Sequence, residues 1–250
     1  MNSLNKVAQI TLLFWLMKIV ATTLGETLGD FIAQTLGLGY TVGILITLTF
    51  FGIVLFIQLT RKKYTPVWFW LVIIATTTLG TEISDFIDRS LHLGYTCGSL
   101  LLFAGLLITL YLWHKKYKSL EVYPIIDQSK ETYYWIAILF SNSLGTAFGD
   151  YLSDVVGLSY LNGAMVTAGI IILVVVLHYF TRINQIFLFW IAFIFTRPFG
   201  ATFGDFLTKP LAKGGLDLGT LNASIVSIFI MSLLIFIAHR KEQSKLNLEH

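Results

Sequence analysis

Apolar residues run in long stretches along the chain, and a few polar positions interrupt them at a regular interval. A stretch of about 20 apolar residues can cross the ~30 Å hydrocarbon layer of a membrane as an α-helix. Stretches of this kind predict helices over residues 8–35, 41–60, 66–89, 95–113, 132–155, 160–180, 186–208 and 218–238. The pattern therefore predicts an all-α integral membrane protein with eight transmembrane helices.

A fourfold repeat is visible in the spacing of Trp, Gly and Asp. In each repeat a Gly follows the Trp by ten residues and an Asp follows the Gly by five; the sets are Trp15, Gly25, Asp30; Trp70, Gly80, Asp85; Trp135, Gly145, Asp150; and Trp190, Gly200, Asp205. Self-similarity of this kind indicates a repeated structural unit. We expect one transmembrane domain over residues 1–247, built from four helical hairpins at approximately 8–63, 64–118, 130–182 and 183–240. Residues 248–250 resemble the start of a purification tag.

Composition agrees with the membrane assignment. Hydrophobic residues make up 56% of the 250 residues and charged residues only 12%, with a mean hydropathy of +0.76. A soluble domain is closer to half apolar and a quarter charged. The net charge of +3 is small and unevenly distributed, so we expect membrane lipids and no nucleic acid as partners. The one cysteine, Cys97, excludes an internal disulfide or a CxxC redox pair.

The positions of Lys and Arg predict the orientation of the helices. Cytoplasmic loops carry an excess of these residues. Twelve of the 17 lie at the N-terminus, after even-numbered helices or at the C-terminus: Lys6, Arg61, Lys62, Lys63, Lys115, Lys116, Lys118, Lys130, Arg182, Arg240, Lys241 and Lys245. Both termini are therefore expected in the cytoplasm. The four repeats would enter the membrane from the same side and be related by an axis along its normal.

The odd-numbered helices carry the polar side chains. At about 100° per residue, Glu26 falls on the same face of the first helix as Asp30, and Glu82 falls on the same face of the third helix as Asp85. The even-numbered helices are almost entirely apolar. We therefore expect odd helices inside and even helices against lipid, with the repeated Trp near the cytoplasmic aromatic belt. The four repeated Asp would form a ring of carboxylates around the axis, or serve as turn and interface residues that hydrogen-bond nearby groups.

The predicted interior is acidic. A charge near the bilayer centre costs about 3 kcal/mol, so it is rarely found there without a task or a partner. Only Lys18 and Arg197 lie within the spans as bases, and each is expected to neutralise a carboxylate or to act in gating. Carboxylate and hydroxyl oxygens suit Mn²⁺, Mg²⁺, Ca²⁺ or protons. The predicted cation ligands are Glu26, Asp30, Glu82, Asp85, Asp150 and Asp205.

These features favour a transporter or channel-like permease for a cation, most of all a divalent metal ion. The cation or a proton would be its substrate, and no cofactor or enzymatic activity is expected. A proton-coupled carrier of a small organic solute is one alternative. Others are an intramembrane enzyme that uses a Glu/Asp pair on a lipid-like substrate, and a non-transporting scaffold.

Two sequence motifs resemble those of a known family. They are Lys18…Thr22-Thr23-x-Gly25-Glu26…Asp30 and Thr196-Arg197-Pro198-x-Gly200-Ala201-x-x-x-Asp205. The chain resembles, over its whole length, a family of bacterial multi-spanning proteins described as uncharacterised membrane or membrane-anchored proteins. The resemblance implies the bacterial cytoplasmic membrane, which is the inner membrane where two are present, and the eight-helix plan. It implies no activity.

Overall fold

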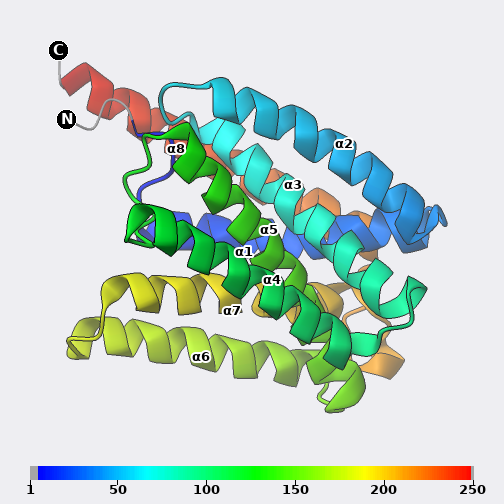
Figure 1. The fold of residues 1–250 in the computed structure, drawn as a ribbon. Helices are drawn as coiled ribbons and strands as arrows, with labels where there is room; N and C mark the ends of the chain where they lie inside the picture. Colours follow the sequence, from blue (N-terminus) through cyan, green and yellow to red (C-terminus); the bar gives the residue numbers. More distant parts are fainter. Residues whose placement is uncertain (1–4, 249–250) are drawn as a thin grey trace.

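The computed structural model describes residues 5–248, which form helices joined by short connections (Figure 1). Within that range the long helices are α1 (Leu12–Asp30), α2 (Gly39–Thr60), α3 (Pro66–Asp85), α4 (Gly94–Tyr117), α5 (Gln128–Asp150), α6 (Tyr160–Phe180), α7 (Gln185–Thr208) and α8 (Thr220–Leu248). A single 3₁₀ turn, η4 (Leu211–Lys213), lies between α7 and α8. Leu248 ends α8, and the other residues of the suspected tag, Glu249 and His250, lie outside the described residues.

Capping residues determine where several helices begin. The side chain of Thr11 accepts a hydrogen bond of 3.3 Å from the backbone of Phe14, so α1 starts later than the apolar pattern predicts. Asp127 accepts one of 2.9 Å from Lys130, so α5 starts earlier than predicted. Pro66 occupies the first position of α3, where a helix needs no backbone donor. Local side-chain chemistry thus fixed boundaries that hydropathy alone misplaced by about four residues.

Three of the repeated Asp stand at a change of helix geometry. A π-helical turn follows directly after each of them: η1 (Phe31–Thr35), η2 (Phe86–Ser90) and η3 (Tyr151–Val155). In η1 the backbone N–H of Leu36 bonds to the carbonyl of Phe31, five residues back, at 2.9 Å. After Asp205 the helix stays α-helical, and the N–H of Lys209 bonds to its carbonyl at 2.8 Å. Single π turns occur often at functional sites.

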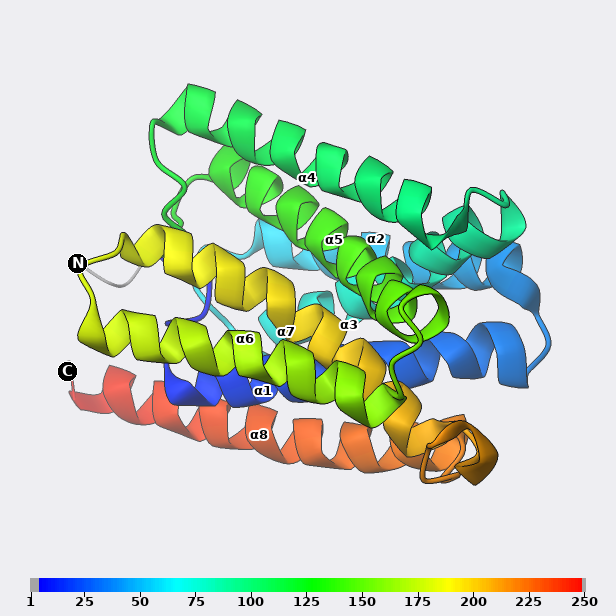
Figure 2. The same cartoon turned by 90° about the horizontal axis from the view of Figure 1, so that it is seen from below.

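The odd helices form a central ring in which α1 packs on α3, α3 on α5, α5 on α7, and α7 on α1. The even helices lie outside this ring (Figure 2). Each even helix packs chiefly against the odd helix of the following repeat, α2 on α3, α4 on α5 and α6 on α7, and α8 closes the circle by packing on α1. The most extensive contacts of each even helix are therefore with another repeat.

The repeated glycines allow the central helices to approach closely. A side chain at three of the four positions would collide with the next repeat: Gly25 with Thr77, Gly145 with Arg197, and Gly200 with Thr22. At Gly80 it would make a tight contact with Asn142 and Ser143. Small residues permit such backbone approach between helices in membranes. These contacts also close a circle, since the fourth repeat meets the first.

Burial separates the two sets of helices. In the most apolar window of α1, α3 and α7, between 61 and 72% of residues are buried, against 22 to 28% in α2, α4, α6 and α8. The expectation that odd helices line the interior is confirmed. Among the described residues, seven helices are long and apolar enough to span a membrane, and α5 is not one of them. Its first turn carries Lys130 and Glu131, and its middle carries Ser141, Asn142 and Ser143; together these residues lower its hydropathy.

Aromatic side chains fill the centre of the bundle where the odd helices begin. We call this the linker end, and the opposite end, where the turns after the odd helices lie, the turn end. Trp70 and Trp135 are each 1% exposed, and the ring of Phe69 lies 5.4 Å from the ring centroids of both. Trp70 and Trp135 therefore belong to the core of the bundle. They lie inside the ring of helices because the odd helices are enclosed at this level.

Candidate functional site

The four repeated Asp are buried near the turn end and lie in two pairs, each bridged by one basic side chain. The guanidinium of Arg89 contacts Asp85 at 3.3 Å and Asp150 at 3.0 Å. The ammonium of Lys209 contacts Asp30 at 2.6 Å and Asp205 at 3.1 Å. Each base follows the Asp of its own repeat by one helical turn and reaches the Asp of the next. One bridge joins the second and third repeats, and the other joins the fourth and first.

The two bridges differ in how firmly their base is held. Arg89 also donates hydrogen bonds to the hydroxyl groups of Tyr40, at 2.8 Å, and Tyr95, at 3.2 Å. Tyr95 in turn donates to Asp154 at 2.8 Å. Within the described part of the chain, the Lys209 ammonium forms a hydrogen bond and ion pair with Asp30 and an ion pair with Asp205. Arg89 thus also contacts two tyrosine hydroxyl groups, whereas Lys209 contacts only the two carboxylates among the described residues.

Arg197 occupies the middle of the helix ring. Its Nη2 donates to Glu26 at 2.9 Å, and to the hydroxyl groups of Thr81 and Thr146 at 2.6 Å each. The three acceptors come one from each of the other three repeats. Arg197 is fully buried and Glu26 nearly so. Arg197 thus pairs with a carboxylate, that of Glu26, as expected. Its side chain also fills the axis of the bundle.

Lys18 lies differently from what was expected. Its ammonium donates to the side-chain carbonyl of Asn142 at 3.0 Å and lies 4.0 Å from the ring centroid of Phe193. Across the described residues no carboxylate comes within ion-pair distance of Lys18. A neutral amide and an aromatic face therefore surround it, because the carboxylates lie further towards the turn end.

Glu82 also departs from the expected arrangement. It stands one residue later in its repeat than Glu26, which turns it about 100° around the helix. It faces α2, where a side chain on Gly43 would come within 2.5 Å of its Oε2. Neither carboxylate oxygen has a hydrogen-bond partner among the described residues, although the side chain is buried. The two glutamates therefore do not share one axial site.

Three of the six predicted ligands converge. Glu26, Asp30 and Asp205 each present a carboxylate oxygen, and these oxygens lie within 4.8 Å of one another. All three residues are buried. Asp85 and Asp150 are tied to Arg89 instead, and Glu82 lies apart. We call Glu26, Asp30 and Asp205 the carboxylate cluster; its hard oxygen donors match the ligand preference of small divalent cations.

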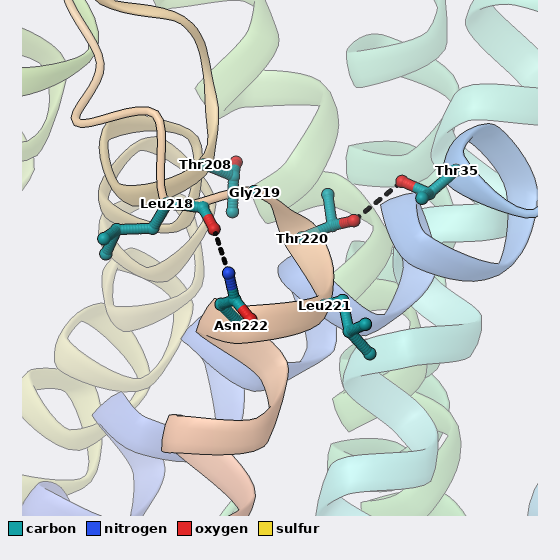
Figure 3. Close-up of a pocket in the computed structure, with 7 residues that line it drawn as sticks. All are labelled: Thr35, Thr208, Leu218, Gly219, Thr220, Leu221 and Asn222. Atoms are coloured by element: carbon teal, nitrogen blue, oxygen red, sulfur yellow. Dashed lines mark hydrogen bonds between the residues drawn. The ribbon is translucent and has the colours of Figure 1, made fainter.

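A pocket of about 310 Å³ lies at the turn end, beside the loop that begins with Lys209 (Figure 3). The hydroxyl groups of Thr35 and Thr220 are 2.7 Å apart across it, and Asn222 donates to the carbonyl of Leu218 at 3.0 Å. Its lining is Thr35, Thr208, Leu218, Gly219, Thr220, Leu221 and Asn222.

Arg89 and Lys209 were not among the site residues predicted from the sequence. A usable signal was present, because each follows a repeated Asp by four residues and so shares its helix face. With these two included, four bases accompany the acids of the interior, not two.

The four repeats correspond to a known family. The family model described as Repeat of Unknown Function (DUF347) matches residues 13–64, 68–119, 133–184 and 188–244. The chain belongs to this family. Each DUF347 repeat contains one odd and one even helix, and the resemblance to an uncharacterised family of repeats is confirmed. No curated protein matches the chain. No solved structure matches it either.

Proposed function

We propose that this protein is a membrane carrier for a cation, foremost a divalent metal ion, bound by the carboxylate cluster. The observation that carries the proposal is the convergence of three buried carboxylate oxygens from Glu26, Asp30 and Asp205 within 4.8 Å. Such oxygens bind Mn²⁺, Mg²⁺ or Ca²⁺ readily. An enzyme that acts on lipid would need a carboxylate at a lateral opening, so the burial of all three favours carriage.

A carrier fits the interior better than a channel. A channel needs a continuous path, but Arg197 fills the axis and aromatic rings fill the linker end. In a carrier the site opens to one side at a time. The side chains of Arg89 and Lys209 are 32 and 23% exposed, which supports access from the turn end in this conformation.

We also propose that all eight helices cross a bacterial cytoplasmic membrane with both termini in the cytoplasm. The start of α1 and the end of α8 lie at the same end of the bundle (Figures 1 and 2). For α5, the support is its place in the central ring between α3 and α7. It begins at the linker end and brings Asp150 to Arg89 at the turn end, as its neighbours do with their own Asp. Its polar first turn would lie at the membrane surface.

Proton coupling is a second candidate, favoured by Glu82. A buried carboxylate without a donor requires a positive partner, which is a proton or another cation. The carboxylates of Glu26, Asp30 and Asp85 interact electrostatically with Glu82, and α2 presents Gly43 to it. If Glu82 takes up the coupling proton, Glu82→Gln should abolish the pH dependence of cation uptake into proteoliposomes. Unchanged pH dependence in that variant would remove the coupling role.

Thermal unfolding of the purified protein with Mn²⁺, Mg²⁺ or Ca²⁺ tests the carrier site. A cation that binds only the folded state stabilises it by RT ln(1+[L]/Kd). Asp30→Asn and Asp205→Asn keep the size of the side chain and remove its charge, so the cation response should weaken in both. Asp85→Asn is the matched control from the other bridge and should keep the response. Full stabilisation in a variant with Glu26→Gln, Asp30→Asn and Asp205→Asn together would exclude the site.

A further inference from the structure

We infer that the ammonium of Lys209 occupies the place of the transported cation in this conformation. The ammonium must leave the carboxylates of Asp30 and Asp205 before a divalent ion can bind. This inference rests on the proposed function and adds to it a competitor within the chain and a preference for the charge of the substrate.

Lys209 contacts two of the three carboxylates that would bind an ion. Its Nζ lies 2.6 Å from Asp30 and 3.1 Å from Asp205, and these are two of the three residues of the carboxylate cluster. A metal ion bound by the same residues would stand within a few ångströms of the ammonium, where two positive charges repel strongly in a poorly hydrated site. The ion and the ammonium therefore exclude each other.

The comparison with Arg89 shows why Lys209 can leave. Both residues hold the same position in their repeats and bridge two Asp in the same way. Arg89 lies within the π turn η2, and its planar guanidinium is also bound to Tyr40 and Tyr95. A lysine ammonium is a point charge on a flexible stem. Two ion contacts hold it, so it can move without dismantling a hydrogen-bond network.

The backbone of Lys209 also differs from that of Arg89. Lys209 is the first residue after α7, with the extended dihedral angles φ −73° and ψ 156°. It begins the connection to α8 that borders the pocket lined by Thr208 and Asn222 (Figure 3). Its side chain is 23% exposed. A rotation of the side chain towards the turn end would free the carboxylates while the helices keep their packing.

The exchange favours a divalent ion on grounds of charge. Asp30 and Asp205 with the Lys209 ammonium carry one negative charge in total, and the same two carboxylates with a divalent cation carry none. Glu26 is already balanced by Arg197 at 2.9 Å. Neutrality matters because an uncompensated charge is costly inside a membrane. A monovalent ion would merely reproduce the charge of the state that holds Lys209.

The test is the affinity of the purified protein for Mn²⁺ in wild type, Lys209→Gln and Lys209→Met. A competitor that fills a site nine-tenths of the time weakens apparent affinity about tenfold, so both variants should bind Mn²⁺ about tenfold more tightly or better. Arg89→Gln is the matched control; it should lower the unfolding temperature and leave the affinity within about threefold. Lys209→Arg retains a charge and should not gain affinity.

A chemical rescue gives a second readout that does not depend on metal. Lys209→Ala removes the ammonium and its stem, so ethylammonium ion should raise the unfolding temperature of this variant more than that of wild type, and Mn²⁺ should cancel that difference. Mn²⁺ binding in wild type without tighter binding in either Lys209→Gln or Lys209→Met would overturn the inference and leave the carrier site standing. No divalent cation response in any variant, wild type included, would overturn both.

Discussion

The guanidinium of Arg197 and the carboxylate of Glu26 form a buried ion pair of 2.9 Å that joins the last central helix to the first. The pair lies where the circle of repeats closes, since α7 packs on α1. A buried pair stabilises little relative to apolar residues, but removing one partner leaves an uncompensated charge. This ion pair therefore helps to hold α7 against α1, and replacing one of its two residues should destabilise the protein.

Arg197→Met should destabilise the folded protein by about 3–5 kcal/mol, because Glu26 is left buried without its counter-charge. Adding Glu26→Gln to the same protein should recover a large part of that loss. Reversible unfolding in mixed detergent micelles measures both. If the double variant is as unstable as the sum of the two single ones, the residues are not coupled.

Substitution of the repeated glycines should destabilise the ring. Gly25→Ala places a methyl group against Thr77, and Gly145→Ala places one against Arg197. Overpacking of this kind costs about 1–3 kcal/mol. Gly169→Ala is the matched control, since nothing lies within 4 Å of a side chain built there. It should be neutral or slightly stabilising in the same unfolding assay, because alanine favours a helix more than glycine does. Equal losses at all three positions would contradict the close approach.

A second buried ion pair, between Lys6 and Glu131, fastens the segment before α1 to the linker end. Lys6 also donates to the carbonyl of Leu59 at 3.0 Å, and Gln58 donates to Glu131 at 2.9 Å. Lys6→Met should lower stability by about 3–5 kcal/mol and should speed proteolysis within the first residues of the chain, since Glu131 stays buried and unpaired. Lys62→Met, at an exposed position, is the control. Identical proteolysis of the two variants would argue against the fastening.

Topology can be tested with reporter fusions. Fusions after Lys63, Lys118, Arg182 and Lys241 should all report the cytoplasm, because these sites follow the even helices and carry most of the positive charge. The decisive pair flanks α5: Lys118 should be cytoplasmic and Gly157 should lie on the opposite face. The same side for both would show that α5 does not cross the membrane.

Helical periodicity along one helix did not predict which neighbour Glu82 faces. Its distance along the chain from Asp85 suggested one polar face shared with Glu26. The repeats, however, align Glu26 with Thr81, and both of these side chains meet Arg197. Glu82 therefore faces the outer helix α2. The position of Glu26 and Thr81 in the repeat faces the bundle axis, and the next position, that of Glu82, faces the outer helix. Hydropathy does not distinguish two positions that differ by one residue.

The sequence by itself determined the helices, the four repeats and the placement of odd helices inside, since these depend on apolar length, on spacing and on about 100° of turn per residue. Only the tertiary structure decided which charges meet. Lys209 reaches Asp30 from 179 residues away, and Arg89 reaches Asp150 from 61 residues away. The physical reason is that such pairs depend on how closely neighbouring repeats pack, which the glycine contacts set, and on the reach of long side chains across that distance. Neither the distance between neighbouring repeats nor the reach of a side chain across it can be predicted from the sequence pattern of a single helix.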